Sequence, residues 1–166
     1  GASFPALAAL NGTDVAFIAF GMASLRVYRW NGSTWAQVGS GLSISIGYPA
    51  LTALNGTDVA FIDSANDALR VYRWDGSTWT QLGSGLTISG ASFPALAALN
   101  GTDVAFIDSA NDSLRVYRWN GSSWAQVGSA GSISLSGGIP ALAAMNGTDV
   151  AFIDSSNKSL RMYRFG

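Results

Sequence analysis

The sequence Asn-Gly-Thr-Asp-Val-Ala-Phe-Ile begins at Asn55, and the sequence Leu-Arg-Val-Tyr-Arg-Trp follows it at residues 69–74. These two segments recur along the whole chain in the same order, with the last copy reading Leu-Arg-Met-Tyr-Arg-Phe. The first segment begins at Asn11, Asn55, Asn100 and Asn146, and the second at Leu25, Leu69, Leu114 and Leu160. The period is roughly 45 residues, which is the size of one supersecondary unit that stacks on its neighbours.

Asn-Gly and Asp-Gly pairs separate the apolar runs inside every unit. Such a pair is a strong hairpin signal, because both central residues of a type I′ turn need a positive φ. We therefore predict four strands in the second unit, at residues 50–54, 58–63, 69–74 and 78–83. The fourth unit ends at Gly166, before the segment that would form its last strand. The pairs begin at Asn11, Asn31, Asn55, Asp75, Asn100, Asn120 and Asn146.

The second predicted strand is apolar on both faces, with Val59 and Phe61 on one side and Ala60 and Ile62 on the other. A strand of this kind suits a sheet that is packed between two neighbouring sheets. We therefore predict an all-β fold, a β-propeller of four-stranded antiparallel blades with nearly four blades in the chain. Residues 1–166 would form one domain, with blade units at approximately 1–40, 41–84, 85–129 and 130–166 and the last blade lacking its outer strand.

Both faces of each blade are apolar, so an open arc of blades would expose two large apolar surfaces, which soluble proteins avoid. Two arrangements would cover them. The chain could close on itself as a four-bladed monomer, or two chains could form a homodimer with an eight-bladed ring. Because the chain offers no spare strand for its last blade, we favour self-association.

The composition excludes several classes of function. Hydrophobic residues make up 48% of the chain, charged residues 11%, and the formal net charge is −1, so neither nucleic acid nor a membrane surface is an expected partner. The chain has no cysteine and no histidine, which excludes disulfides, histidine triads and Cys/His zinc sites. We predict no metal and no cofactor, and a secreted and a synthetic protein fit the sequence equally well.

Aspartates and arginines face each other across the second hairpin of three units. They could clamp a polar ligand, or they could form a cross-strand ion pair that holds the hairpin. A calcium site at the same turn is a weaker hypothesis, because the spacing is not that of an EF-hand loop. The candidate ligand-binding residues in this group are Asp63, Arg70, Asp108, Arg115, Asp154 and Arg161.

Tryptophans flank the turn between the third and fourth predicted strands. Sugars stack on exposed indole faces, so these rings are candidate carbohydrate-binding residues, but the same rings could fill the wide outer gap between blades. The residues in this group are Trp30, Trp35, Trp74, Trp79, Trp119 and Trp124.

The order of motifs in the unit resembles that of bacterial propeller lectins that bind fucose-type sugars. In the first unit these motifs are Pro-Ala-Leu-Ala from Pro5, Asp-Val-Ala-Phe from Asp14, Leu-Arg-Val-Tyr-Arg-Trp from Leu25 and Ser-Thr-Trp-Ala-Gln-Val-Gly from Ser33. This resemblance covers the whole chain and implies a propeller that binds carbohydrate. Residues 74–79 are also similar to the sialidase Asp-box, which is a folding element.

Three functions follow as hypotheses. The first is a multivalent, lectin-like binding module without enzymatic activity. The second is an amplified or designed blade array that only folds and assembles, which the near-identity of the units favours: residues 1–10 recur letter for letter at residues 90–99. The third and least favoured is a glycosidase, because glycosidases need a specific carboxylate pair, whereas this chain has no glutamate and its aspartates recur with the repeat.

Overall fold

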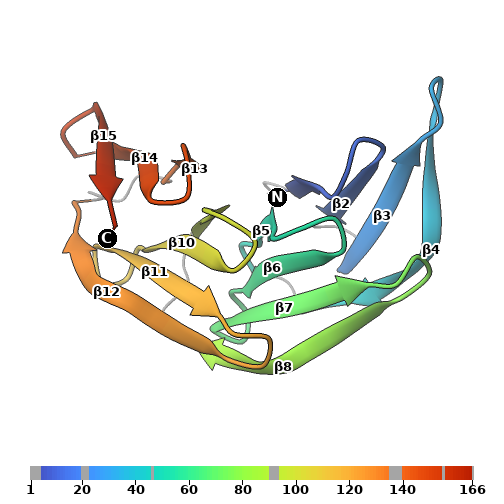
Figure 1. Cartoon of the computed structure of the whole chain (residues 1–166), viewed down its shortest axis with the longest axis horizontal. Coiled ribbons are helices and arrows are strands. Elements are labelled where there is room, and N and C mark those ends of the chain that lie inside the picture. Colours follow the sequence, from blue (N-terminus) through green and yellow to red (C-terminus); the bar gives the residue numbers. More distant parts are fainter. Residues whose placement is uncertain are drawn as a thin grey trace.

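The computed structural model describes residues 5–19, 23–45, 47–89, 94–134, 140–154 and 156–165, and every regular element in them is a strand. Fifteen strands form four separate antiparallel sheets, each of which connects its strands in chain order. Figure 1 shows the sheets arranged around a common centre as propeller blades, with the first strand of each blade innermost. The predicted all-β propeller is confirmed, and so is the three-stranded last blade.

The blades repeat one strand pattern. Blade 1 contains β1 (Ala6–Ala9), β2 (Asp14–Ala19), β3 (Ser24–Trp30) and β4 (Trp35–Ser43). Blade 2 contains β5 (Ala50–Ala53), β6 (Asp58–Asp63), β7 (Ala68–Trp74) and β8 (Trp79–Thr87). Blade 3 contains β9 (Ala95–Ala98), β10 (Asp103–Asp108), β11 (Ser113–Trp119) and β12 (Trp124–Ser132). Blade 4 contains β13 (Leu142–Ala144), β14 (Asp149–Asp154) and β15 (Ser159–Arg164).

The hairpin turns lie where the Asn-Gly pairs predict them, but the predicted type I′ geometry is wrong. None of the asparagines of these pairs has a positive φ in the described residues. Instead, the Asn55 Oδ1 accepts hydrogen bonds from the backbone N–H groups of Thr57 (2.9 Å) and Asp58 (2.8 Å). The asparagine side chain therefore replaces the backbone geometry of the tight turn. Asp75 accepts the same bonds from Ser77 and Thr78 in the turn between β7 and β8.

The outer strand is longer than the sequence predicts, because it continues through a bulge. In blade 2, Val71 pairs with Leu82 whereas Leu69 pairs with Leu86, so β8 carries extra residues between the two pairs. Gly83 lies in this bulge with a φ of 57°, a left-handed conformation that favours glycine. The bulge presents the backbone of β8 to the next blade, where it meets the turn that follows β11.

The hydrophobic core lies between the blades. Ala60, Ile62 and Leu69 of blade 2 pack against Phe106 and Trp119 of blade 3 in one buried cluster. Equivalent clusters join blade 1 to blade 2 and blade 3 to blade 4. Apolar residues on both faces of β6 are therefore buried, as the sequence predicts for a sheet between two sheets.

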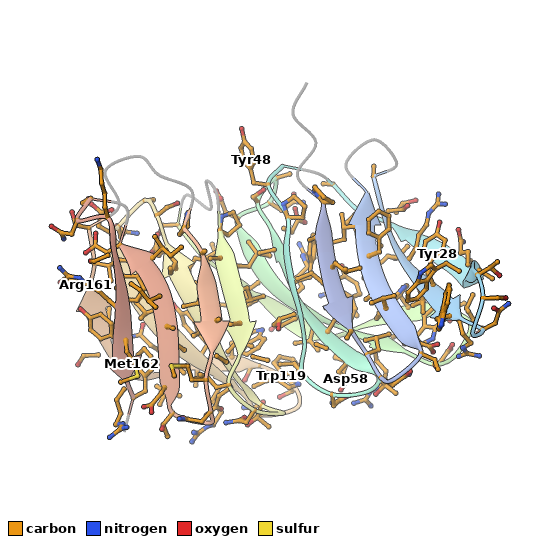
Figure 2. All side chains as sticks on the ribbon, turned by 90° about the horizontal axis from the view of Figure 1, so that it is seen from above. Tyr28, Tyr48, Asp58, Trp119, Arg161 and Met162 are labelled. Atoms are coloured by element: carbon orange, nitrogen blue, oxygen red, sulfur yellow. The ribbon has the colours of Figure 1, made fainter. Side chains whose placement is uncertain are left out.

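None of the three clusters joins blade 4 to blade 1 within the described part of the chain. The two blades lie at opposite ends of the array in Figure 1. Figure 2 shows the same separation from another side, with Met162 of blade 4 near one end and Tyr28 of blade 1 near the other. As a result, each end blade leaves one apolar face uncovered.

Candidate functional site

The predicted arginines and tryptophans of one blade lie on the same face of its sheet, and in blades 2 and 3 this face packs against the preceding blade. In blade 1 the Arg26 guanidinium donates to the Gln37 Oε1 (3.0 Å), and the Gln37 amide donates to the Gly39 carbonyl (3.1 Å). A Cβ on Gly39 would lie 2.6 Å from the Trp74 ring of blade 2. The Ser40 N–H also donates to the Ser77 carbonyl of blade 2 (3.0 Å). We call this boundary seam 1/2 and define it by Gly39 of blade 1 and by Arg70, Gln81, Trp74 and Trp79 on the face of blade 2 that packs against blade 1. Arg26 and Gln37 lie on the other face of blade 1, opposite Phe17 and Tyr28 in the register.

Seam 2/3 has the same construction and is defined by Gly83 of blade 2 and by Arg115, Gln126, Trp119 and Trp124 of blade 3. In seam 1/2 the Arg70 guanidinium donates to the Gln81 Oε1 (3.0 Å), and in seam 2/3 the Arg115 guanidinium donates to the Gln126 Oε1 (3.5 Å). The Gln81 amide also donates to the carbonyl of Gly83 in its own strand (3.1 Å). A Cβ on Gly83 would clash with the Trp119 ring of blade 3. Two boundaries of this chain therefore hold the arginine, the glutamine and the tryptophan pair of one blade against the bulge glycine of the preceding blade.

The third boundary lacks the tryptophans. Blade 4 has Phe165 at the position of Trp74 and has no fourth strand to carry the equivalent of Trp79. A Cβ on Gly128 would have open space around it, and a hollow of about 370 Å³ lies beside it, lined in part by Arg164 and Phe165. Arg161 of blade 4 thus faces this boundary with neither a glutamine nor a tryptophan pair beside it.

The tryptophans of the inner blades are buried between sheets. Trp74 and Trp79 contact each other with ring centroids 5.2 Å apart, and so do Trp119 and Trp124. All four are less than a tenth exposed, whereas Trp30 and Trp35 of blade 1 are open to solvent. The buried indole Nε1 atoms of Trp74, Trp79 and Trp124 have no hydrogen-bond partner among the described residues. An unpaired buried donor is costly, so these atoms identify a place where a ligand oxygen or an ordered water would be stabilised.

The predicted aspartates lie away from the tryptophans of their own blade, at the other end of the hairpin. Asp63 is buried, and its carboxylate accepts from the Asn66 amide at 2.6 Å, whereas Arg70 lies 3.8 Å away. Asp108 and Asp154 are held in the same way by the asparagine of their own turn. For Asp154 this amide bond is the main cause of a lowered pKa. These carboxylates are therefore held by hydrogen bonds within their own turns. The arginine side chains are the more exposed members of the pairs.

Arg70 differs from its equivalents in one donor. The Nε of Arg26 donates to the Ser24 hydroxyl at 2.8 Å, and Arg115 and Arg161 bond a serine in the same way. Blade 2 has Ala68 at that position, and the Arg70 Nε is buried without a hydrogen-bond partner among the described residues. Among the described residues, seam 1/2 therefore has three unpaired buried donors, at Arg70, Trp74 and Trp79, whereas seam 2/3 has one, at Trp124.

A second set of arginines was not anticipated. Arg73 donates to both carboxylate oxygens of Asp58, each at 2.7 Å, and the same bidentate pair recurs in every blade. The bond from Arg73 is the main cause of the lowered pKa of Asp58. The signal was present in the sequence, because the pair sits directly opposite in the register of β6 and β7. It holds the hairpin together.

Two other results concern the described residues as a whole. They contain no group of three or more acidic, histidine or cysteine side chains that could hold a metal ion. They also contain no helix that is long and apolar enough to cross a membrane.

No family model and no curated protein matches the chain. Solved structures do match its fold. A mutant of Aleuria aurantia lectin in complex with Fucα1-6GlcNAc is 17% identical, with a TM-score of 0.68 over 96% of this chain and 57% of that one. A mutant of AofleA from Arthrobotrys oligospora is 18% identical, with a TM-score of 0.62 over 98% and 56%. Streptogramin B lyase is 14% identical, with a TM-score of 0.61 over 99% and 55%.

The chain therefore spans about half the length of these structures. They include lectins and an enzyme, so at these identities the similarity concerns the fold and not the activity. The chain is an all-β propeller array of four blades, and it shares that fold with propeller lectins.

Proposed function

We propose that this protein is a non-enzymatic, lectin-like module that binds carbohydrate weakly at seam 1/2 and seam 2/3. The observation that carries the proposal is the recurrence at both seams of an arginine–glutamine pair on the same sheet face as a tryptophan pair, with unpaired indole N–H groups at Trp74, Trp79 and Trp124. The ligand would be neutral and rich in hydroxyl groups.

The chemistry of the seams supports this ligand class. Guanidinium, amide and indole groups all donate hydrogen bonds, and sugar hydroxyls accept them. Tryptophan edges provide apolar surface beside these donors, as sugars require. The lectin structures with the same fold include one solved with Fucα1-6GlcNAc, and this makes fucose-type sugars the first ligands to try.

Equivalent sites in one chain would increase the affinity for a surface that displays many sugars, because the second contact forms within the same complex. The self-association that the sequence predicts would increase the number of sites further. The coverage of about half of each lectin chain is in keeping with it.

A second function has one observation in its favour. The four inner tryptophans are buried and fill the space between blades, as a purely structural role requires. In that case the chain would be an array whose property is folding and assembly, with waters satisfying the unpaired donors.

The test is a titration with methyl α-L-fucoside and other simple sugars, followed by tryptophan fluorescence and by NMR. We expect saturable binding that is weakened about tenfold or more by the double variant Arg70→Ala/Arg115→Ala, because each substitution removes a charged donor. Circular dichroism would verify that the variant keeps its strands.

Arg161→Ala is the matched control. Arg161 has the same place in blade 4 but faces a boundary without the tryptophan pair, so its loss should leave binding unchanged. Absence of saturable binding at millimolar sugar would favour the structural array. Equal losses of affinity in the double variant and in the control would show that the seams are not the binding site.

A further inference from the structure

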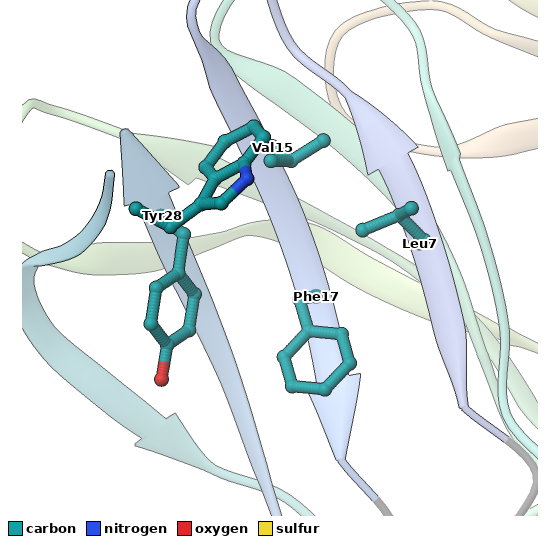
Figure 3. Close-up of a pocket in the computed structure, with 5 residues that line it drawn as sticks. Leu7, Val15, Phe17 and Tyr28 are labelled. Carbon is teal, nitrogen blue, oxygen red and sulfur yellow. The ribbon is translucent and has the colours of Figure 1, made fainter. Parts of the chain in front are cut away.

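The free face of blade 1 is an exposed copy of a surface that is buried elsewhere in the molecule. Trp35 is 54% exposed, whereas Trp79 at the same position of blade 2 is 8% exposed. Leu7 and Trp30 are likewise exposed, in contrast to Leu51 and Trp74. Figure 3 shows the hollow on this face, which has a volume of about 360 Å³ and is lined by Leu7, Val15, Phe17, Tyr28 and Trp35.

The free face of blade 4 is an exposed copy of the surface that blade 2 packs against blade 3. Leu160 is 76% exposed, whereas Leu69 at the same position of blade 2 is fully buried. Ile153 and Met162 are also exposed, and this face has its own hollow of about 200 Å³. Small side chains line that hollow together with the larger ones, namely Ala141, Ala143, Ala151, Ile153 and Leu160 among others.

The interface between blades 2 and 3 shows how these two kinds of surface fit. The blade 2 side consists of Ala50, Leu54, Ala60, Ile62, Leu69 and Val71, and the blade 3 side includes Val104, Phe106, Tyr117, Trp119 and Trp124. The free face of blade 4 has the blade 2 set, with methionines replacing Leu54 and Val71. The free face of blade 1 has the blade 3 set without a change: Val15, Phe17, Tyr28, Trp30 and Trp35.

We propose that a second copy of this chain docks head to tail, with the free face of blade 4 on the free face of blade 1, and that two such junctions close a ring of two chains. Each junction would be a continuation of the three interfaces already present within the chain. The proposal does not depend on carbohydrate binding.

A second copy is the occupant that the observations favour. The two uncovered faces are complementary to each other and not to themselves, so the contact must be heterologous, and heterologous contacts form rings where the rotation closes. Two copies also reach the length of the solved propellers, because one copy covers 57% of the Aleuria lectin chain and 56% of AofleA.

The innermost strands identify a pair of positions that would meet at the junction. Within the chain, the Thr52 hydroxyl of blade 2 accepts from the Ala98 N–H of blade 3 at 3.1 Å. The equivalent positions at the free ends are Ala143 in blade 4 and Ala9 in blade 1, and both are exposed. Ala143 of one copy should therefore lie against Ala9 of the other.

Cross-linking tests this contact directly, since the chain has no cysteine of its own. We expect the double variant Ala9→Cys/Ala143→Cys to form covalent dimers under mild oxidation on a non-reducing gel. Each single variant should remain a single chain there. Both positions are exposed alanines, so the substitutions leave the core intact.

Each other result would overturn the proposal. A disulfide within one chain would mean that four blades close on themselves. Self-linked single variants would mean that like faces meet. Ladders of more than two chains would mean an open filament or a larger ring, and no cross-link at all would mean that the faces do not meet.

Native mass by light scattering provides an independent readout. We expect twice the mass of one chain, falling twofold with Leu160→Asp, which places a charge in the junction. Thr80→Asp, at an exposed position of β8 in an inner blade, should leave the mass unchanged. A native protein with the mass of one chain, or a Thr80 variant that dissociates equally, would contradict the ring of two chains.

Discussion

Blade 2 and the two end blades have nearly the same sequence, but the same side chains have different surroundings. In blade 2 both faces are covered, and Leu69 and Trp79 are buried. In blade 4 the residue equivalent to Leu69 is open to solvent, and in blade 1 the residue equivalent to Trp79 is open. The contribution of a residue in this repeat is therefore decided by whether a neighbouring blade is present, and not by the residue type.

The largest expected contrast is between Trp79→Ala and Trp35→Ala. Removing a buried tryptophan should lower the free energy of unfolding by about 3–5 kcal/mol, whereas removing the exposed one should cost clearly less. Urea unfolding of chains kept single by Leu160→Asp would measure both. Equal losses would mean that blade 1 is covered even in the single chain.

The leucine pair tests the other face in the same way. Leu69→Ala should cost about 2–5 kcal/mol because it leaves a cavity between blades 2 and 3. Leu160→Ala should change the stability of the single chain by no more than about 0.5 kcal/mol. The measurement is the urea midpoint at a dilution where the native mass is that of one chain. A loss at Leu160 that grows with protein concentration would instead report the junction.

Alanine substitutions at the two bulge glycines, Gly83 and Gly128, would distinguish the effect of backbone strain from that of steric overlap. Gly83 and Gly128 have φ values of 57° and 66°, so an alanine at either position suffers the same left-handed strain of about 1–2 kcal/mol. At Gly83 the added Cβ would also clash with the Ser122 carbonyl of blade 3, whereas at Gly128 it has open space. We expect Gly83→Ala to be the more destabilising by about 1–3 kcal/mol in thermal or urea unfolding. Equal losses of stability in the two variants would show that blade 3 moves away from the added methyl group without a measurable loss of stability.

The smallest contrast should come from a bond that stays within each blade. The pKa of Asp58 and that of Asp14 are lowered by a bidentate bond from an arginine of the same hairpin. Such a bond contributes stability above the unfolded pKa of about 3.9, and the contribution is lost as the pH falls through the folded value. Asp58→Asn should therefore be less stable than the native chain at pH 6, with a gap that narrows below about pH 4.

Asp14→Asn should show the same pH dependence, although Asp14 lies in an end blade. Urea unfolding from pH 2 to pH 6 would compare the two variants. A gap that does not change with pH, or one that differs between the blades, would contradict a purely local role of the pair.

Much of the fold could be predicted from the sequence, because the same apolar runs and Asn-Gly pairs occur in every unit. The strands at residues 50–54 and 58–63 coincide with β5 and β6 to within a residue, since apolar runs and Asn-Gly pairs delimit them. The end of the outer strand was missed because Gly83 resembles a terminator, whereas it occupies a bulge through which β8 continues.

The site was harder to predict, because it joins residues of different units. The sequence suggested Asp63 and Arg70 as one pair and Trp74 and Trp79 as another within the same unit. In the structure, Arg70 and the tryptophan pair lie on one face of blade 2, and the Gly39 bulge of blade 1 packs against Trp74. Contacts between units depend on how blades stack, and no spacing within one unit reveals that.

The aspartate–arginine bond has a consequence for how such a protein can change by inheritance. Asp58 and Arg73 close their bond inside one hairpin, and the turn at Asn55 is also self-contained. A gene that gains or loses one whole unit therefore gains or loses a blade whose internal bonds are complete. The blades that become neighbours can still pack together, because every blade face is a copy of one of two surfaces. Blade number is thus a trait that a single recombination event can alter without any compensating substitution.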